Sequence, residues 1–400
     1  MKKIMILGAS ILQLPAIKKA KEMGLEVVVV DMNPAAIGFK EKNIKCEVIS
    51  TIDTEKILEA ARKHKIDGIM TLASDMPMRS VAKVSKEMKL IGIDEDTALR
   101  TTNKALMREC LFKNGIPVPE FFKVNSKNEF IDIIEYFKKK KMSCIIKPVD
   151  NSGSRGVDLI SNFTNMDFIN KSFEYSKKYS RNGDIIVEEY MEGPEVSVET
   201  LSINGICNVI QITDKLTTGA PYFVEMGHNE PSMLNEEIKK EIAKVASAAV
   251  NAVGIKNGPS HTEIKVTKNG PKIVEIGARL GGDNITTHLV PLSTGIDMVK
   301  CCIQIALGEK VDLKAKISKG SAIRYFKTEL GEIEDIEGIE EAKKIKGIQQ
   351  ISLIYNIGEK IKSIQNSTDR AGFVIAQAAT PEEAIKTCEN ALKKIKIKVR

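Results

Sequence analysis

Short apolar runs that alternate with amphipathic segments limit most strongly how the first hundred residues can fold. The run "LEVVVVDMN" at residues 25–33 is apolar without alternation, as in a parallel strand that is covered on both faces. The other apolar runs lie at 2–9 and 66–73, and the amphipathic segments lie at 12–24, 53–65 and 77–89. This order of elements predicts a parallel sheet packed between helices, an α/β unit over residues 1–97.

The rest of the chain shows a different pattern. Its strands alternate polar and apolar side chains, as antiparallel strands with one buried face do. A helical pattern covers 235–254, and a hairpin pattern covers 261–283. We expect an α+β unit over residues 98–312, followed by a small mixed unit over residues 313–400.

Composition argues against several classes of protein. The seven cysteines are scattered and form no Cys-x-x-Cys pair, so neither a zinc site nor a disulfide framework is expected. Such thiol usage is typical of a reducing cytoplasm. The net charge is only +7 and Trp is absent, so no surface that stacks nucleic-acid bases is predicted. No apolar run approaches the roughly 18 residues that span a bilayer, so no membrane segment is predicted.

The segment "CIIKPVDNSGSRGV" at 144–157 has the composition of a binding loop. Lys147 lies inside a short apolar strand, and a polar turn with Gly153 and Gly156 follows. Glycine-rich backbone after a strand can direct N–H groups at an anion such as a phosphate. The order differs from the Gly-Lys-Ser/Thr phosphate loop and from the Gly-x-Gly-x-x-Gly dinucleotide turn. The rest of the chain must therefore indicate what this loop binds.

Paired carboxylates indicate a metal site. Glu263 and Glu275 lie twelve residues apart on the two strands of the predicted hairpin, so they can stand side by side on one face. Adjacent carboxylates repel each other unless a cation lies between them, and Mg²⁺ is the natural partner. Arg279 follows and can bind a phosphate with its planar guanidinium. An exposed strand, with the charges balanced by Lys265 and Lys272, is the alternative.

A strand end further back has features of an adenosine site. Glu188 and Glu189 end an apolar strand and lead into Tyr190 and Met191. Backbone groups at such a strand end can bond the edge of an adenine, and Met191 can lie against the ring. Glu195 follows and can accept hydrogen bonds from ribose hydroxyls. A solvated pair of glutamates is the alternative.

The turn after the first strand raises a different hypothesis, a nicotinamide oxidoreductase. Gly8 follows that strand, and Asp31 ends the second strand 23 positions later, near the place of a ribose-binding acid. Only one of the three glycines of a dinucleotide turn is present. A tight strand-to-helix turn, or a small-anion site at a helix N-terminus, also explains Gly8.

Taken in order, these segments resemble the ATP-grasp superfamily of ligases over nearly the whole chain. Lys104 in "TTNKALMRE" and Lys147 resemble the two nucleotide-binding lysines of that superfamily. The resemblance implies a lid subdomain at about 119–190 and a C-terminal unit of the biotin-carboxylase-like branch. The implied ATP site comprises Lys104, Lys147, Ser152, Gly153, Ser154, Gly156, Val157, Glu188, Glu189, Tyr190, Met191 and Glu195.

The same resemblance implies a metal site and catalytic residues. Glu263 and Glu275 would hold one or two Mg²⁺ ions, with Mn²⁺ as an alternative. Lys147 and Arg279 would be the catalytic residues. One position departs from the superfamily pattern Glu-x-Asn-x-Arg, because Gly277 replaces the metal-binding Asn. Water or Asp283 is expected to substitute, and a nucleotide-binding protein without turnover stays an alternative.

The implied reaction joins a carboxylate to an amine through an acyl phosphate and releases ADP and phosphate. The segments "TTGAPYFVEMGHNEPS" and "GPSHTEIK" resemble the branch of amino-acid ligases, so an amino acid or another small carboxylate is the expected substrate. The layout also resembles phosphoribosylglycinamide synthetase and the formate-dependent transformylase, but no Arg/Lys cluster for a second phosphate is evident. A cytoplasmic enzyme, as a homodimer, is implied. Candidate substrate contacts are Glu225, His228, Arg279, Gly281, Gly282 and Asp283, with Arg324 and Arg370 as weaker candidates for a substrate carboxylate. His261 is a candidate to support the metal ligands, with a structural role as the alternative.

Overall fold

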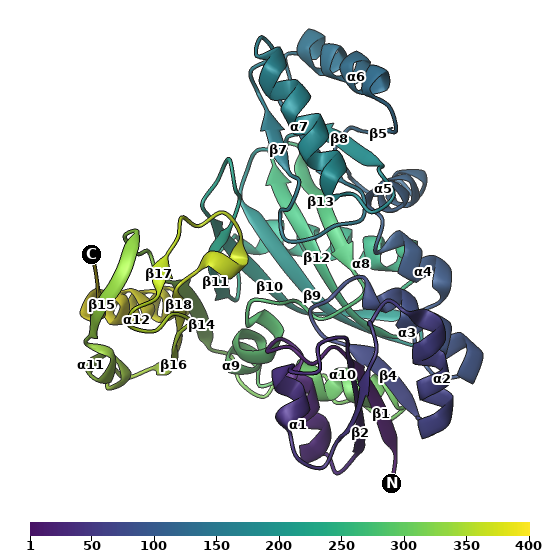
Figure 1. Cartoon of the computed structure of the whole chain (residues 1–400), viewed down its shortest axis with the longest axis vertical. Coiled ribbons are helices and arrows are strands. Elements are labelled where there is room, and N and C mark those ends of the chain that lie inside the picture. The colour runs from purple at the N-terminus through teal and green to yellow at the C-terminus, as the bar shows by residue number, and fades with distance from the viewer.

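A parallel four-stranded sheet begins the fold, as the sequence predicts. The computed structural model describes all 400 residues. Neighbouring strands are parallel throughout, in the order β3-β2-β1-β4. The strands are β1 (Lys3–Leu7), β2 (Glu26–Asp31), β3 (Lys45–Val48) and β4 (Gly68–Thr71). The helices around it are α1 (Leu14–Glu22), α2 (Thr54–His64) and α3 (Pro77–Met88) (Figure 1).

Both faces of this sheet are buried, which explains why β1 and β2 are continuously apolar. Met5 and Leu7 enter a core with α2 and α3, whereas Ile4 and Ile6 enter a second core with α1 and α10 (Met298–Ala306). Each of these two cores also includes side chains of the main sheet described below. The N-terminal unit is therefore packed firmly against the rest of the chain. Helices α4 (Glu95–Arg100) and α5 (Lys104–Lys113) lead out of it.

A small antiparallel sheet forms a separate projection at the top of Figure 1. Its strand order is β5-β8-β6-β7, and all three pairs are antiparallel. Phe130, Phe137 and Phe173 lie in its own hydrophobic core. Its elements are β5 (Phe121–Val124), α6 (Lys127–Lys140), β6 (Cys144–Pro148), β7 (Asp158–Ile160), α7 (Met166–Tyr179) and β8 (Ile185–Glu189).

The main sheet has eight antiparallel strands in the order β13-β12-β9-β10-β11-β14-β18-β16. Helix α8 (Glu236–Val253) packs its apolar side into the core beside this sheet. The strands are β9 (Glu195–Ile203), β10 (Ile206–Thr217), β11 (Glu225–Glu230), β12 (Gly258–Thr267), β13 (Gly270–Gly277), β14 (Gly320–Tyr325), β16 (Ile348–Leu353) and β18 (Gly372–Ala378).

The C-terminal unit shares that sheet. Strand β14 lies beyond the boundary expected at residue 313, yet it pairs with β11 from Gly227–Arg324 to Glu230–Ser321. The proposed boundary at residue 313 therefore divides the sequence, but the backbone hydrogen bonds of the main sheet continue across it from β11 to β14. The remaining elements are a π-helix (Ile285–Leu289), α9 (Val290–Thr294), β15 (Gly331–Glu337), α11 (Ile339–Lys343), β17 (Lys360–Ile361), α12 (Pro381–Lys394), β19 (Lys396–Val399) and two 3₁₀ turns (Ile37–Lys40 and Ser367–Asp369).

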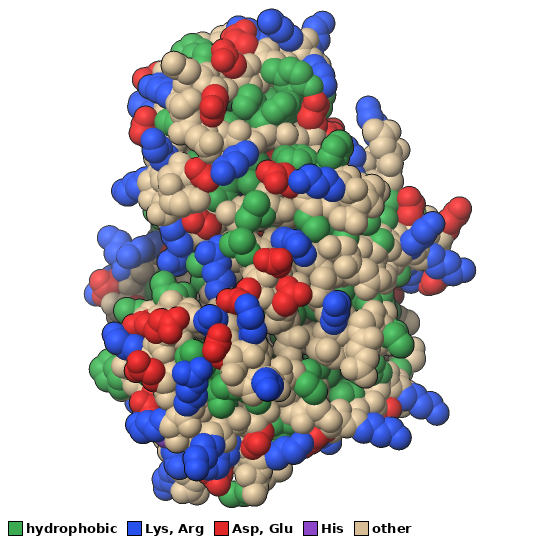
Figure 2. All heavy atoms as spheres, turned by 90° about the vertical axis from the view of Figure 1, so that its right-hand side faces the viewer, with side chains coloured by type: hydrophobic (Ala, Val, Ile, Leu, Met, Phe, Trp, Pro, Cys, Tyr) green, Lys and Arg blue, Asp and Glu red, His purple; other side chains and the backbone are tan.

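The surface is mixed in character. Figure 2 shows basic and acidic side chains interspersed over the face drawn there. Taken one at a time, none of the helices combines the length and the apolar composition needed to cross a membrane. Only the pair Ile285–Thr294 and Met298–Ala306, bent by 112°, reaches that length and composition when joined.

Candidate active site

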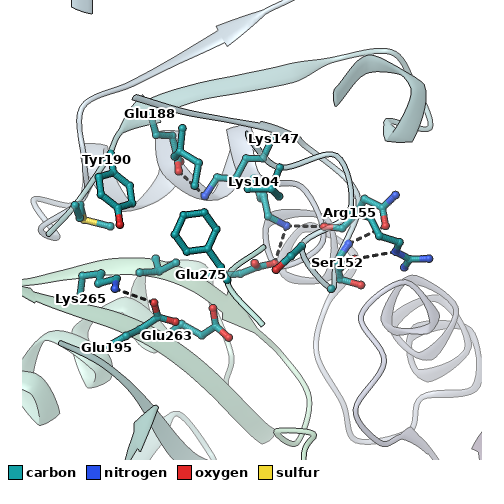
Figure 3. A pocket seen from close by; sticks show the side chains of 18 of the residues that line it. Lys104, Lys147, Ser152, Arg155, Glu188, Tyr190, Glu195, Glu263, Lys265 and Glu275 are labelled. Carbon is teal, nitrogen blue, oxygen red and sulfur yellow. Dashed lines mark hydrogen bonds and ion pairs between the residues drawn. The ribbon is translucent and has the colours of Figure 1, made fainter. Parts of the chain in front are cut away.

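A pocket opens between the small sheet and the main sheet. Its lining includes strands β6 and β8 of the small sheet and β9, β10, β12 and β13 of the main sheet (Figure 3). All of the predicted ATP-site residues line it except Gly156, and so do Glu263, Glu275 and Glu225. Gly156 lies behind the loop, where a Cβ would come within 2.9 Å of the Tyr179 Cβ.

A buried ion-pair triad fixes the predicted lysine Lys147. Its Nζ lies 2.5 Å from Oε2 of Glu188, and Nε of Arg108 lies 2.5 Å from Oε1 of the same carboxylate. Burial alone would raise the pKa of Glu188, but Arg108 and Lys147 lower it to about 2. The Glu188 carboxylate therefore points at two cations inside the structure. Sequence reasoning missed Arg108, which lies 80 positions earlier on α5.

Replacing Arg108 with Met should destabilise the fold strongly. Arg108 is fully buried, so the variant leaves Glu188 with one cation instead of two, at a cost of about 3–5 kcal/mol of unfolding free energy. Because the folded pKa of Glu188 is below its unfolded value of 4.5, its contribution is present above pH 4.5 and lost as pH falls toward 2. Urea unfolding at pH 7 and pH 3 measures the unfolding free energy. The difference in unfolding free energy between wild type and variant should be smaller at pH 3 than at pH 7. The exposed Arg62→Met variant is the control, and an equal loss there would contradict the argument.

Lys104 connects the glycine-rich loop to the hairpin. It begins α5, and its Nζ donates to the Asn151 carbonyl at 2.7 Å and to Oε1 of Glu275 at 2.8 Å. Burial alone would lower the pKa of Lys104, but Glu275 raises it above its usual value. The loop after Lys147 reaches over this contact, and Gly153 there takes a positive φ of 70° with open space around it. Loop backbone, lysine and carboxylate thus meet at one point of the pocket.

The two predicted metal ligands are direct neighbours. Glu263 on β12 pairs in register with Glu275 on β13, so both side chains project from the same face. In each carboxylate a lysine occupies Oε1, while Oε2 accepts no hydrogen bond from the chain. Two such free oxygens suit a hard divalent cation. No group of three acidic, His or Cys side chains is arranged as metal ligands, so bound phosphate and water would supply the remaining oxygens.

Lys215 is a central cation that sequence reasoning missed. Its side chain on β10 is 3% exposed, and three carboxylates lie within 3.5 Å of its Nζ: Glu195, Glu225 and Glu263. Burial alone would lower its pKa, but these carboxylates raise the pKa well above its usual value. Lys215 thus links the predicted ribose, substrate and metal residues. A lysine within the strand "ICNVIQITDKLT" was the available signal, but only the fold reveals its partners.

Asp75 is the third residue that sequence reasoning missed. It lies between β4 and α3, and its Oδ1 accepts a 2.8 Å hydrogen bond from Nε of Arg279. The predicted substitute for the missing Asn, Asp283, is held elsewhere: the Arg370 guanidinium donates to both of its oxygens at 2.7 Å. The structure therefore places Asp75, and not Asp283, beside Gly277.

Of the predicted substrate residues, only Glu225 lines the pocket; His228, Gly281, Gly282 and Asp283 lie outside its lining, as does the predicted catalytic residue Arg279. Arg370 stacks on the Tyr325 ring, binds Asp283 and donates to the Glu225 carbonyl. His228 is almost fully buried and lies 3.5 Å from Asp283, while both of its ring nitrogens lack a hydrogen-bond partner. Arg324 instead donates to the carbonyls of His228 and Ile323 on the main sheet.

His261 lies on β12 of the hairpin that carries Glu263 and Glu275, here called the metal hairpin. Its Nδ1 lies 2.6 Å from Oε1 of Glu199, and its Nε2 lies 3.5 Å from Oε1 of Glu263. Burial alone would lower the pKa of His261, but Glu199 raises it to about 9. A Cβ on Gly281 would come within 2.7 Å of this imidazole, so the glycine allows the loop to pass close to it.

The N-terminal turn does not resemble an open dinucleotide site. Oδ2 of Asp31 accepts from the Ala9 N–H at 2.7 Å, and Oδ1 accepts from the Asn33 N–H at 2.9 Å. The Gln13 side chain packs against Gly8, where a Cβ would approach it to 2.7 Å. Asp31 therefore stabilises its own turn. The structure thus agrees with the alternative in which Gly8 forms a tight strand-to-helix turn.

Two family models match the chain in consecutive regions. Residues 140–287, from β6 to the metal hairpin and beyond, match the ATP-grasp domain, and residues 324–400 match the L-amino acid ligase C-terminal domain 2. The chain therefore contains an ATP-grasp domain over residues 140–287. The ATP-grasp match contains Lys147, Glu188 and both hairpin carboxylates. Members of this superfamily bind ATP and a divalent metal, and the paired free oxygens described above are consistent with that.

Named relatives of this ATP-grasp protein are ligases. It is 28% identical to an L-arginine-specific L-amino acid ligase of Bacillus subtilis over 286 residues, which are 70% of this chain and 67% of that one. It is 25% identical to the phosphoribosylamine–glycine ligase of Methanocaldococcus jannaschii over 417 aligned positions, 95% of this chain and 90% of that one. The crystal structure of an L-amino acid ligase from Bacillus licheniformis has the same fold, with a TM-score of 0.85 at 24% identity, covering 100% of this chain and 99% of that one.

These comparisons confirm the predicted fold class and enzyme class. The ATP-grasp fold is preceded by a parallel α/β sheet and followed by a small mixed unit, as expected. The enzyme is an ATP-grasp ligase of the class that forms carbon–nitrogen bonds.

Proposed function

We propose that the chain is an ATP-dependent carboxylate–amine ligase that acts through an acyl phosphate on an amino acid or a small carboxylate. One observation carries the proposal: Lys104 and Lys147 meet the paired carboxylates Glu263 and Glu275 around a single pocket. Such a set of cations and metal-binding oxygens can hold and activate a polyphosphate. Apart from Gly277, these residues stand at the positions where the sequence resembles the ATP-grasp pattern.

In this proposal the small sheet and the hairpin bind ATP from opposite sides. Lys147 and Lys104 contact the phosphates, and backbone N–H groups of residues 152–157 close over them. Tyr190 and Met191 bind the adenine, and Glu195 binds the ribose. Glu188 acts indirectly, because its carboxylate holds Lys147 in place.

Glu263 and Glu275 would hold the divalent cation through their free Oε2 atoms. We propose Mg²⁺, with Mn²⁺ as an alternative, because both carboxylates are hard oxygen donors. When bound, the cation neutralises part of the negative charge of the phosphates. Lys104 already touches Glu275 and Lys215 already touches Glu263, so both lysines add positive charge beside the same groups.

The reaction then needs positioning and charge stabilisation. A substrate carboxylate oxygen attacks the γ-phosphorus in line, the bond to the bridging oxygen breaks, and ADP leaves with that electron pair. The amine then attacks the acyl carbon, phosphate leaves, and the amine loses a proton. Arg279, Lys147 and Lys215 stabilise the charge that develops on the transferred phosphoryl group. No covalent bond to the enzyme is required.

The substrate end of the pocket favours an amino acid. Glu225 lines the pocket beside Lys215, so an acidic group is available to a substrate ammonium. Backbone groups of Gly281 and Gly282 could receive a carboxylate. The match of residues 324–400 to an L-amino acid ligase domain supports this assignment.

A ligase of the phosphoribosylamine–glycine type is the second candidate. It is favoured by the alignment with such an enzyme across 95% of this chain. It requires a second phosphate site, and the pocket lining has no such cluster of basic side chains beyond the ATP-site lysines, Arg155, Lys215 and Lys265. The amino-acid ligase therefore ranks first.

A hydroxylamine trap tests the proposal directly. The protein is incubated with MgATP, excess hydroxylamine and pools of amino acids or small carboxylates. One pool should yield a hydroxamate and ADP, because hydroxylamine intercepts an acyl phosphate. A pool of glycine that reacts only when phosphoribosylamine is present would favour the second candidate. Tight MgATP binding with neither hydroxamate nor ADP in any pool would contradict the ligase proposal.

A further inference from the structure

The space beside Gly277 is filled by a carboxylate from a distant part of the chain. A Cβ placed on Gly277 would lie 2.9 Å from Oδ1 of Asp75 and 3.3 Å from Nε of Arg279. In the common superfamily pattern an Asn side chain projects from this position. We propose that Asp75 occupies in space the place of that missing side chain and positions Arg279 against the phosphates. The inference rests on the proposed ATP site.

The ion pair is well placed for a positioning role. The Asp75 and Arg279 side chains are only 15% and 16% exposed, and one short hydrogen bond joins Oδ1 to Nε. Within the guanidinium, Nη1 donates weakly to the Leu280 carbonyl at 3.3 Å, and Nη2 donates to no group of the chain. The Nε edge is therefore fixed while the other end stays available to an anion.

The turn that carries Asp75 is itself anchored. Ala73 takes a positive φ of 56°, a conformation that L-residues rarely adopt, and Gln13 donates to the Leu72 carbonyl and to the Ser74 hydroxyl. These contacts hold the turn between β4 and α3 in place beside Gly277 and Arg279. Asp75, in this turn of the N-terminal unit, thereby orients Arg279, which follows β13.

The electrostatics agree with this geometry. Asp75 and Glu275 both act on Lys104, and each raises the pKa of that lysine against the effect of burial. Asp75 therefore lies close to Lys104 as well as to Arg279. No third carboxylate is arranged with Glu263 and Glu275 as a metal ligand, so the role assigned to Asp75 is positioning and not metal coordination.

Reciprocal substitutions test the inference. Asp75→Ala should weaken MgATP binding by about tenfold and lower kcat for hydroxamate formation by roughly 10², since Arg279 loses its fixed orientation. Asp75→Asn keeps an oxygen that can accept from Nε and should lose less. Gly277→Asn alone should also weaken MgATP binding, because its side chain competes with Asp75 for the same space.

The double variant Asp75→Ala/Gly277→Asn gives the decisive result. Its MgATP affinity should return to within about threefold of wild type, since one side chain replaces the other. Glu87→Ala on α3 is the control; Glu87 pairs with Arg62 and Lys83, outside the pocket, so MgATP affinity should not change.

Calorimetry of MgATP binding reads out this test without turnover. Unchanged MgATP affinity in Asp75→Ala, or additive losses in the double variant, would overturn the positioning role. A wild type that binds MgATP but gives no hydroxamate would refute the ligase reaction and still leave the affinity test of Asp75 decisive. A wild type that binds no MgATP would overturn both.

Discussion

Glu275→Gln is expected to lower hydroxamate formation by about 10²–10³-fold while the protein stays folded. The substitution removes one of the two paired charges, so Glu263 alone would have to hold the cation that neutralises the phosphates. The amide of Gln still offers an oxygen to Lys104, whose Nζ lies 2.8 Å from the native carboxylate. The loss should therefore fall on turnover and on the Mg²⁺ requirement more than on thermal stability.

Titration of activity with Mg²⁺ at saturating ATP measures this effect. The half-saturating Mg²⁺ concentration should rise in Glu275→Gln. Glu337→Gln is the control because Glu337 pairs with Lys398 at an exposed site far from the pocket lining. If Glu275→Gln turned over like wild type at every Mg²⁺ concentration, the proposed metal role of the hairpin would be refuted.

Lys215→Met is expected to cost both stability and activity. The variant leaves Glu195, Glu225 and Glu263 without their common cation in a buried setting, and breaking such a site costs about 3–5 kcal/mol of unfolding free energy. Turnover should also fall by roughly 10² or more, since a charge beside the transferred phosphoryl group is lost. Urea unfolding and the hydroxamate assay measure the two effects.

A matched control variant and a pH series test the predicted loss of stability. Lys265→Met removes a lysine that also contacts Glu195, at 3.2 Å, but is 21% exposed, so its stability loss should be much smaller. The pKa of Lys215 is raised in the fold, so its contribution is complete at neutral pH and lost only as pH rises through that folded pKa. The pKa of Glu263 is lowered in the fold, so its contribution to stability is lost as pH falls below its unfolded pKa of 4.5. The unfolding free energies of wild type and Lys215→Met should therefore differ most near neutral pH. A difference in unfolding free energy that stays constant down to pH 3 would contradict this account.

Local pattern was sufficient to predict the elements and part of the site. Continuous apolar runs indicated the parallel sheet because β1 and β2 are buried on both faces. The spacing of Glu263 and Glu275 indicated their pairing because a two-stranded hairpin turns about its midpoint. Lys147 was recognisable because a lysine inside an apolar strand is unusual and indicates a specific role.

The partners of these residues could not be read from local pattern. Arg108 and Lys215 lie on a helix and a strand whose periodicity does not record which charges they will meet. Asp75 reaches Arg279 across 204 positions, and only the packing of the N-terminal unit brings them together. The expectation that Asp283 replaces the side chain missing at Gly277 failed for the same reason, since Arg370 of the C-terminal unit holds it.

The continuity of the main sheet limits how the chain could be shortened. A fragment that ended near residue 312 would lose β14, and β11 would become an edge strand with unpaired N–H and C=O groups. It would also lose Arg370, so Asp283 would be left without its cation. Such a fragment would retain every predicted ATP-site residue, yet it would present an open strand to other molecules and invite aggregation.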